Sequence, residues 1–263
     1  MLLAIDIGNT DIVFGIYDSV SWIHQFRISS SLSQRASDYE AQLRIHFLEN
    51  SLKFNDINQA IISCVVPDQR AVLKEMVQQM FGLDPVMVGV EMYDKLKMII
   101  PSPYEIGTDL VCNAVYAYYT HRKNCLIVDF GTALTFTVVT GEGQILGVSI
   151  APGLKTAVKA LFSNTAQLPE VPLVMPDSAI GKNTVHAIQA GILWGYVGMV
   201  REMIYQIKKE VGQDCVVLAT GGLSSILTPL REEFDEVDKA LTLNGLKIIS
   251  ELVYGNYKNK STF

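Results

Sequence analysis

The chain has 263 residues, of which 49% are hydrophobic and 18% are charged, and its formal net charge at pH 7 is -6. This length allows one large domain or two smaller ones, and the apolar content argues against a globally disordered chain. The acidic balance argues against broad nucleic-acid binding, and no apolar run reaches the roughly 18–20 residues of a membrane span. We therefore expect neither a nucleic-acid partner nor a membrane partner.

The N-terminal residues contain no basic leader and reach an acidic residue at position 6. This pattern is not that of a signal peptide, and it predicts a cytoplasmic protein. The four cysteines form no Cys-x-x-Cys pair, so we expect buried free thiols in a reducing compartment. The four histidines are equally dispersed, and no zinc site is expected.

Three consecutive strands open the first half of the chain, and helices and strands alternate after them. Strands are predicted at residues 2–7, 12–17, 23–28, 60–66 and 86–90. Helices are predicted at residues 39–48, 71–81 and 109–119. A capping box at residues 37–40 favours the first helix start, and Asp68 and Asp109 are acidic caps for the other two. Residues 91–107, which contain Pro101, Pro103 and Gly107, are expected to form a loop.

The second half repeats much of this order. Strands are predicted at residues 125–130, 134–139, 145–150 and 216–219. Helices are predicted at residues 154–162, 185–209 and 245–254, and the longest of them can be capped by Asn183 or Thr184. Residues 163–180 contain three prolines and are expected to be irregular.

The two halves therefore predict an α/β fold with mixed sheets and helices on both sheet faces. Two such layers fit a duplicated RNase H-like, two-lobed fold of the actin/hexokinase type (ASKHA). The expected lobes are residues 1–118 and residues 119–263.

One acidic turn occurs twice, each time directly after a predicted buried strand. Residues 6–10 read Asp-Ile-Gly-Asn-Thr, and residues 129–132 read Asp-Phe-Gly-Thr. Each copy combines a carboxylate at a strand end with a tight turn that carries backbone N–H donors, which suits phosphate oxygens and a hard cation. Two such turns on opposite sides of a cleft predict a nucleotide site, whereas either copy alone also fits an ordinary hairpin turn.

Two further motifs could contribute to such a site. Gly221 and Gly222 follow the strand at 216–219 and allow close approach of a ring or ribose. Asp109 follows Gly107 and Thr108 at a helix start, where it is either an N-cap or a carboxylate that orients a substrate hydroxyl and accepts its proton. No P-loop, no Gly-x-Gly-x-x-Gly after the first strand and no Gly-x-Ser-x-Gly elbow occurs in the sequence.

Taken in order, several stretches resemble type III pantothenate kinase across nearly the whole chain. They are residues 6–10, 63–67, 107–109, 129–133, 151–153, 180–185, 189–192, 219–223 and 241–246. The resemblance implies phosphorylation of pantothenate by ATP to 4'-phosphopantothenate, the first step of coenzyme A biosynthesis. It also implies Mg²⁺ or another divalent metal with ATP, a monovalent cation such as K⁺ or NH₄⁺, and a cytoplasmic homodimer.

The resemblance also implies roles for individual residues. The positions at the ATP phosphates are Asp6, Ile7, Gly8, Asn9, Thr10, Asp11, Ile12 and Val13, with Thr132 also touching ATP. Asp6 is expected to bind the divalent metal, and Asp129 is expected to bind the monovalent cation. Asp109 is expected to accept the proton of the pantothenate hydroxyl. The substrate-binding positions are Ile100, Gly107, Thr108, Asp109, Leu110 and Thr184.

Two of these positions depart from the family pattern. Leu110 stands where the family usually has arginine, and Ile100 stands where it tends to have tyrosine. An arginine can bind a carboxylate through two parallel hydrogen bonds and leucine cannot. Two alternatives therefore stay open: a divergent kinase of another hydroxy acid, and a non-catalytic nucleotide-binding regulatory paralogue.

The apolar positions of the helix at residues 185–209 have two interpretations. They are Ile188, Ile192, Trp194, Val197 and Val200. A helix face of this kind packs either against a second subunit or into the core of its own domain.

Overall fold

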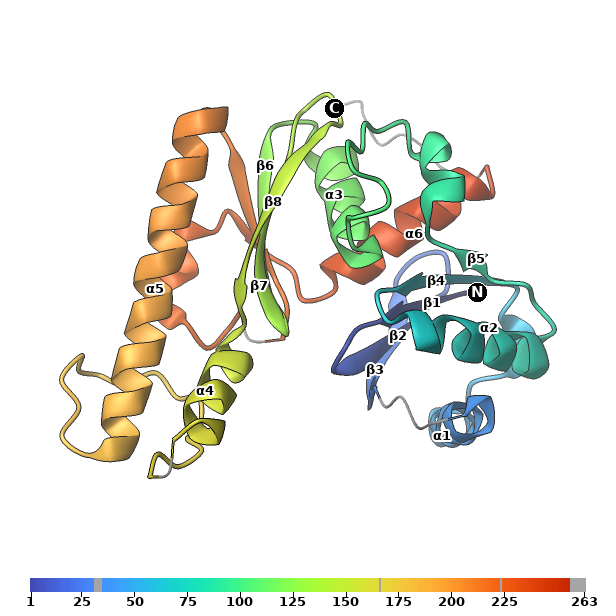
Figure 1. Ribbon diagram of the computed structural model, residues 1–263. Helices are drawn as coiled ribbons and strands as arrows, with labels where there is room; N and C mark the ends of the chain where they lie inside the picture. The colour runs from blue at the N-terminus through green and yellow to red at the C-terminus, as the bar shows by residue number, and fades with distance from the viewer. Residues whose placement is uncertain (31–34, 166, 223, 256–263) are drawn as a thin grey trace. The chain divides into compact units, whose positions relative to one another are not determined.

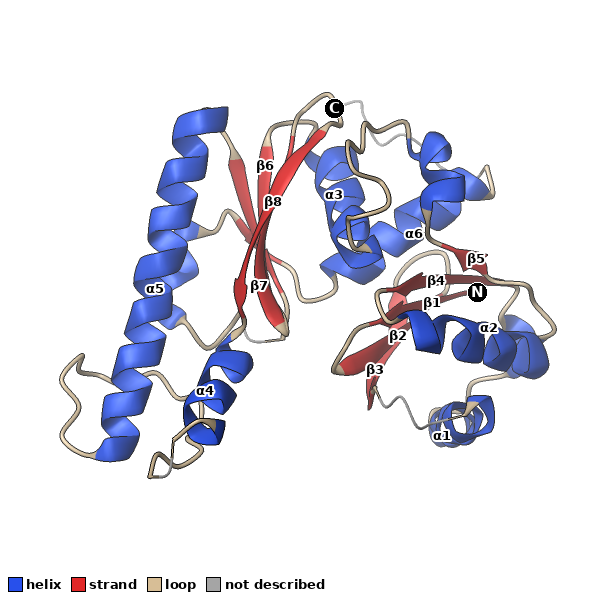
Figure 2. Cartoon of the chain, viewed as in Figure 1, coloured by secondary structure: helices blue, strands red, loops and turns tan. Residues whose placement is uncertain are grey.

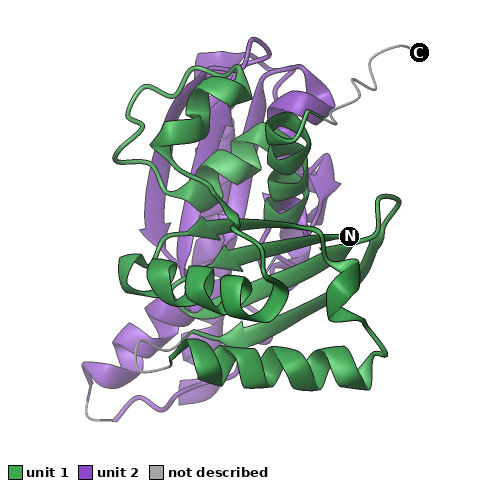
Figure 3. Ribbon diagram, turned by 90° about the vertical axis from the view of Figure 1, so that its right-hand side faces the viewer, with its two compact units in different colours: residues 1–116, 242–263 green, residues 117–241 purple. Residues whose placement is uncertain are grey.

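The computed structural model describes residues 1–30, 35–165, 167–222 and 224–255 (Figure 1). Its contacts divide the chain into two compact units, drawn in two colours in Figure 3. Unit 1 comprises Met1–Tyr116 and Thr242–Phe263, and unit 2 comprises Ala117–Leu241.

Unit 1 is built on a mixed five-stranded sheet in the order β3-β2-β1-β4-β5. The strands are β1 (Leu2–Ile7), β2 (Asp11–Tyr17), β3 (Trp22–Ser29), β4 (Gln59–Cys64) and β5 (Val86–Met87). β1 pairs antiparallel with β2 and parallel with β4, so it lies at the centre of the sheet. Three residues, 8–10, join β1 to β2, while a longer crossover that contains a helix joins β3 to β4.

Helices cover the sheet of unit 1. They are α1 (Ala36–Glu49), α2 (Pro67–Phe81), α3 (Thr108–His121) and α6 (Leu241–Val253), with the 3-10 helices η1 (Phe54–Asp56) and η2 (Val90–Leu96). Alternate residues of β1 and β2 join buried residues of α1 and α2 in one apolar cluster. Figure 2 shows α1 and α2 on the same side of this sheet. The intervening residues, including Asp6 and Ser63, therefore point to the opposite face.

Unit 2 repeats the same plan with the order β10-β9-β6-β7-β8. Its strands are β6 (Cys125–Phe130), β7 (Ala133–Val139), β8 (Ile145–Pro152), β9 (Val216–Thr220) and β10 (Glu236–Val237). Its helices are α4 (Leu154–Ser163) and α5 (Thr184–Val211), with the 3-10 helix η3 (Thr228–Glu233). The central strand β6 pairs antiparallel with β7 and parallel with β9.

The two sheets have equivalent topology, because β6, β7, β8, β9 and β10 correspond in order and direction to β1, β2, β3, β4 and β5. This equivalence confirms the predicted duplicated α/β fold with mixed sheets. It also places the two acidic turns at equivalent positions, because each follows the central strand of its own sheet.

The closing helix belongs to the first unit rather than to the second. The Cα of Gly245 lies so close to the carbonyl oxygen of Cys112 that an added Cβ would collide with it. The Trp22 indole Nε1 donates a hydrogen bond of 2.7 Å to Asn244 Oδ1, which also ties α6 to β3. This division by contacts differs from the expected lobes, residues 1–118 and 119–263. Those lobes describe where one copy of the repeat ends and the next begins, and that boundary stays a prediction.

The long helix α5 begins at a side-chain cap, as predicted, since Asn183 Oδ1 accepts a hydrogen bond of 2.9 Å from His186 N. Its predicted apolar positions pack into unit 2 itself: Val197 and Val200 are buried in the main cluster, and Ile188 joins a smaller one. Core packing therefore explains these side chains. Within the described residues, no helix combines the length and apolar character needed to cross a membrane.

Local differences from the predicted elements are small. The strand expected at 86–90 ends at Met87, residues 91–96 lie in the 3-10 helix η2 where a loop was expected, and α1 and α2 each begin a few residues early. Asp38 accepts a hydrogen bond of 2.8 Å from Arg35 N, so the chain caps α1 through Asp38 rather than through the predicted box at 37–40.

Candidate active site

The first acidic turn closes the hairpin between β1 and β2. Ile7 pairs with Ile12, and Gly8 N donates a hydrogen bond of 3.0 Å to Asp11 O. The turn is thus both a regular hairpin and an exposed loop, with the side chains of Asn9 and Thr10 at the surface. The carboxylate of Asp11 forms an ion pair of 2.9 Å with Arg27, which braces the turn against β3.

Asp6 and Ser63 lie side by side at the carboxyl ends of two parallel strands. Asp6 on β1 is the register partner of Ser63 on β4, so both side chains leave the same face of the sheet. Ser63 is fully buried. Its hydroxyl oxygen lies 2.9 Å from Thr108 Oγ1, at the first residue of α3.

The contact between Ser63 and Thr108 brings Asp109, the predicted proton acceptor, to the region of Asp6. Cys64 N donates a hydrogen bond of 3.0 Å to Thr108 Oγ1, so the start of α3 is tied to the end of β4 by two hydrogen bonds. Asp109 follows directly, and its Oδ1 accepts a hydrogen bond of 2.8 Å from Leu110 N. An added Cβ on Gly107 would collide with this same carboxylate oxygen, so a larger residue there would displace the Asp109 side chain.

The electrostatics of this region favour proton uptake by Asp109. Burial raises the pKa of the Asp109 carboxyl above its ordinary value, and the hydrogen bond from Leu110 N opposes the rise. Burial also raises the pKa of the Cys112 thiol, and the negative charges of Asp6 and Asp109 add to that rise. Cys112 is therefore a neutral thiol close to both carboxylates, and a poor nucleophile.

The second acidic turn joins β6 to β7 in unit 2. Gly131 N donates to Ala133 O over 3.1 Å, and the side chain of Thr132 is exposed. Gly153 approaches this turn so closely that an added Cβ would collide with Gly131 O. Its amide donates a hydrogen bond of 3.1 Å to Thr132 O, which fixes the turn to the start of α4.

Hydroxyl groups flank the carboxylate of the second turn. Asp129 is the register partner of Thr135 on β7 and of Thr220 on β9, so the three side chains share one face of the sheet. Thr135 is 9% exposed, and its hydroxyl oxygen has no hydrogen-bond partner among the described residues. Gly221, with a φ of +91°, passes so near that an added Cβ would lie 2.7 Å from Asp129 Oδ1.

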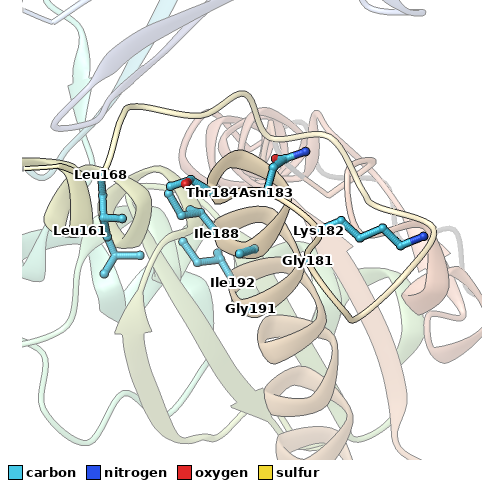
Figure 4. Close-up of a pocket in the computed structure, with 10 residues that line it drawn as sticks. Leu161, Leu168, Gly181, Lys182, Asn183, Thr184, Ile188, Gly191 and Ile192 are labelled. Carbon is cyan, nitrogen blue, oxygen red and sulfur yellow. The ribbon is translucent and has the colours of Figure 1, made fainter.

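A cavity of about 620 Å³ lies between α4, the segment before α5 and the first turns of α5. Its wall is largely apolar, and Figure 4 shows Leu161 and Leu168 on one side, facing Ile188 and Ile192 of α5. Thr184 contributes a hydroxyl at the first residue of α5, and the Lys182 side chain points away from the other lining residues.

The structure thus gathers Asp6, the turn that follows it and residues 107–110 within unit 1, and it gathers Asp129, Thr132 and the Gly221 turn within unit 2. Thr184 lies in the cavity of unit 2. The Leu110 side chain is buried, and Ile100 lies in the partly exposed segment before Gly107. Sequence reasoning assigned no role to Ser63 or Thr135, whose positions depend on strand register.

Fold and turns together define a class: duplicated α/β proteins of the actin/hexokinase type, with an acidic turn after the central strand of each sheet. One solved structure with this fold is MreB 5 of Spiroplasma citri bound to AMPPNP. It shares 9% identity with the chain, covers 97% of each chain and has a TM-score of 0.54. At this identity the likeness concerns the fold alone.

The family follows from sequence comparison. The family model for type III pantothenate kinase matches residues 2–206. A type III pantothenate kinase of Treponema pallidum strain Nichols is 44% identical over 260 residues, covering 96% of this chain and 94% of the relative. Another, from Pelobacter propionicus, is 40% identical over 251 residues, covering 95% and 99%. The chain belongs to the type III pantothenate kinase family.

Proposed function

We propose that this protein transfers the γ-phosphoryl group of ATP to the hydroxyl of pantothenate, forming 4'-phosphopantothenate in the first step of coenzyme A biosynthesis. One observation carries this proposal beyond family membership. A partly buried carboxylate, Asp109, is fixed at the start of α3 and is tied through Thr108 and Ser63 to the strand end that bears Asp6.

The Asp6 turn is the proposed site of the ATP phosphates, formed by residues 6–13. Its glycine and exposed polar residues offer backbone and side-chain donors to phosphate oxygens. Asp6 is the proposed contact of the divalent metal. Mg²⁺ in such sites is commonly held by one or two carboxylates together with substrate phosphates and water, which suits a single carboxylate at this turn.

Asp109 is the proposed base. As the acceptor oxygen forms its bond to the γ-phosphorus and the bond to the ADP oxygen breaks, Asp109 takes the hydroxyl proton. The raised pKa of Asp109 makes its carboxylate a better proton acceptor than an exposed aspartate. Most of the rate enhancement then comes from positioning and charge neutralisation.

The second turn is proposed to contact the nucleotide and to hold the monovalent cation. Thr132 has an exposed hydroxyl, and the turn at Gly221 and Gly222 allows close approach of the nucleotide. Asp129 and the buried hydroxyl of Thr135 offer oxygen ligands on one sheet face, which suits K⁺ or NH₄⁺. A cation bound there would neutralise the charge of Asp129 and so favour the negatively charged ATP phosphates near this turn.

Pantothenate binding is proposed at residues 107–110, at Ile100 and at Thr184. Leu110 is buried and offers its backbone amide to Asp109 rather than a side-chain charge to the substrate. The carboxylate of pantothenate therefore has to be bound by a cationic or hydrogen-bond donor group other than the arginine that the family usually has at this position. A kinase for a different hydroxy acid is the second candidate, and Leu110 is the observation that favours it.

A cytoplasmic homodimer is also proposed, and α5 offers a surface for it. Gly191, Gly195 and Gly198 are exposed along one face of α5, with no atom within 4 Å of an added Cβ. Such a face allows another helix to approach closely. Sedimentation of Gly195→Arg against Gln206→Arg, an exposed control on the same helix, tests it: only the former should give a monomer, and a monomeric wild type would contradict the proposal.

The activity is tested by ADP release from ATP, Mg²⁺ and K⁺ in the presence of pantothenate or a panel of other hydroxy acids. We expect turnover with pantothenate and at most slow turnover with the panel. Turnover with another acid and none with millimolar pantothenate would establish the second candidate. ATP binding without turnover of any acceptor would show a non-catalytic protein.

A further inference from the structure

We propose that Ser63 is a positioning residue that sets the distance between the phosphate-binding turn and the base, Asp109. The inference rests on the proposed roles of Asp6 and Asp109. Ser63 is the residue that contacts both sides of the site: it is the strand partner of Asp6, and it hydrogen bonds to Thr108, the residue that precedes Asp109.

The hydrogen bonds restrict how Thr108 can turn. Cys64 N donates to Thr108 Oγ1, so one lone pair of that oxygen is occupied over 3.0 Å. The second hydrogen bond, 2.9 Å to Ser63 Oγ, restrains the position of Thr108 Oγ1 from another side, whichever of the two oxygens donates. With both bonds made, the first turn of α3 cannot rotate about its axis without breaking one of them.

Two close contacts transmit this restraint to the carboxylate. The Asp109 side chain lies against Gly107, and its Oδ1 accepts from Leu110 N. The carboxylate is thus held between its own helix start and the preceding glycine. A shift of the helix start therefore becomes a shift of the Asp109 oxygens.

Ser63 is buried completely, so solvent does not replace a lost hydroxyl. Without the Ser63 hydroxyl, Thr108 keeps its bond from Cys64 N, and the helix start keeps its place on β4. We therefore expect Ser63→Ala to fold, but with a looser Asp109. A misplacement of about 1 Å in a catalytic group costs as much as ~100-fold in rate.

The two strand ends show the same arrangement in both units. Thr220 of β9 stands beside Asp129 of β6 as Ser63 stands beside Asp6. In unit 1, this hydroxyl position is hydrogen-bonded to the start of the helix that carries the proposed base. The equivalence shows that the position at the end of the fourth strand of each sheet accepts a hydroxyl residue.

The test compares Ser63→Ala, Thr108→Val and the double variant in steady-state kinetics. We expect kcat to fall about 10- to 100-fold in each single variant, with the KM for ATP within about two-fold of wild type. The double variant should fall little further than Thr108→Val, because both changes remove the hydrogen bond between Ser63 and Thr108, and Thr108→Val also removes the bond from Cys64 N. Thr108→Ser keeps the hydroxyl and should therefore retain most of the wild-type kcat.

Ser250→Ala is the matched control, since Ser250 is a buried serine of α6 in the same unit, outside the site. It should keep the wild-type kcat. The positioning role is overturned if Ser63→Ala keeps the wild-type kcat, or if kcat, ATP affinity and melting temperature fall in parallel. A wild type that turns over no acceptor at all would overturn the proposed function instead, and the positioning role with it.

Discussion

Gly245 of α6 packs directly against the backbone carbonyl of Cys112 in α3. The residues beside it reinforce the crossing, since Thr242 Oγ1 donates a hydrogen bond of 2.9 Å to Asn113 Oδ1, and Asn113 is fully buried. Cys112 is also one turn beyond Asp109. The C-terminal helix therefore supports the helix that carries the proposed base.

Gly245→Ala should destabilise the protein, because an added methyl group would overlap the Cys112 carbonyl and push α6 away from α3. Overpacking of this kind costs about 1–3 kcal/mol. Urea denaturation measures the loss. Gly147→Ala is the control, because no atom lies within 4 Å of an added Cβ there, and it should stay within about 0.5 kcal/mol of wild type. Equal stability of the two variants would contradict the tight crossing.

Asp109→Asn should abolish most turnover while leaving ATP binding intact. Asparagine can still accept the hydrogen bond from Leu110 N, but it cannot take a proton from the acceptor hydroxyl. We expect kcat to fall about 100- to 10,000-fold, with the ATP dissociation constant unchanged within error. Coupled ADP release and calorimetric ATP titration measure the two quantities. A variant that keeps its rate would show that Asp109 is only a helix cap.

The same substitution should raise the melting temperature at neutral pH. The pKa of Asp109 in the folded state is raised above its ordinary value of 3.8, so the folded protein binds this proton more tightly than the unfolded chain does. The proton therefore stabilises the fold at low pH, and this contribution is lost as pH rises through the folded-state pKa. The ionised carboxylate therefore destabilises the native state at pH 7, and asparagine removes this cost. The gain should shrink as pH falls toward 4; a lower melting temperature for the variant at pH 7 would contradict the sign.

Gly221→Ala should weaken nucleotide binding. Its φ of +91° is unfavourable for alanine, and the added Cβ would lie 2.6 Å from Phe130 O and 2.7 Å from Asp129 Oδ1. The turn must shift, and we expect the ATP dissociation constant to rise about 10-fold or more, which corresponds to about 1.4 kcal/mol. Fluorescent-nucleotide titration measures it, with Gly147→Ala as the unaffected control. Unchanged affinity would remove the Gly221 turn from the nucleotide site.

Thr135→Val should raise the K⁺ concentration needed for half-maximal rate by about 10-fold, because it removes one oxygen beside Asp129. Saturating K⁺ should recover the wild-type rate. Thr137→Val is the matched control, two residues along the same strand face and also buried, but paired with Ile127 instead of Asp129. If both variants keep the wild-type K⁺ dependence, Thr135 is not a cation ligand.

Much of the fold was predictable because it depends on local signals. Strand-like apolar runs separated by short turns predicted β1, β2 and β3, and the recurrence of this order predicted the second sheet. The structure adds η3 and the two-residue strand β10, which are too short to give a periodic pattern. The return of α6 to unit 1 depends on a contact between residues more than one hundred positions apart, and no local pattern encodes it.

The candidate site was predictable only in part, for a related reason. Turn residues such as Gly8 and Gly131 reveal themselves by their type, and Asp109 by its helix start. Ser63 gave no such signal, because its role depends on the register of β1 against β4 and on a contact with Thr108. Leu110, in contrast, was noticed in the sequence because its residue type departs from the family pattern. The structure explains this type by the burial of the side chain.

The central claim is that this chain phosphorylates the hydroxyl of pantothenate. Mass spectrometry of a reaction with ATP, Mg²⁺, K⁺ and pantothenate tests it most directly, with Asp109→Asn run in parallel. The account predicts that the wild type converts pantothenate to its singly phosphorylated form and that the variant leaves it almost unchanged. Unmodified pantothenate in the wild-type reaction, under conditions where ATP demonstrably binds, would contradict the account.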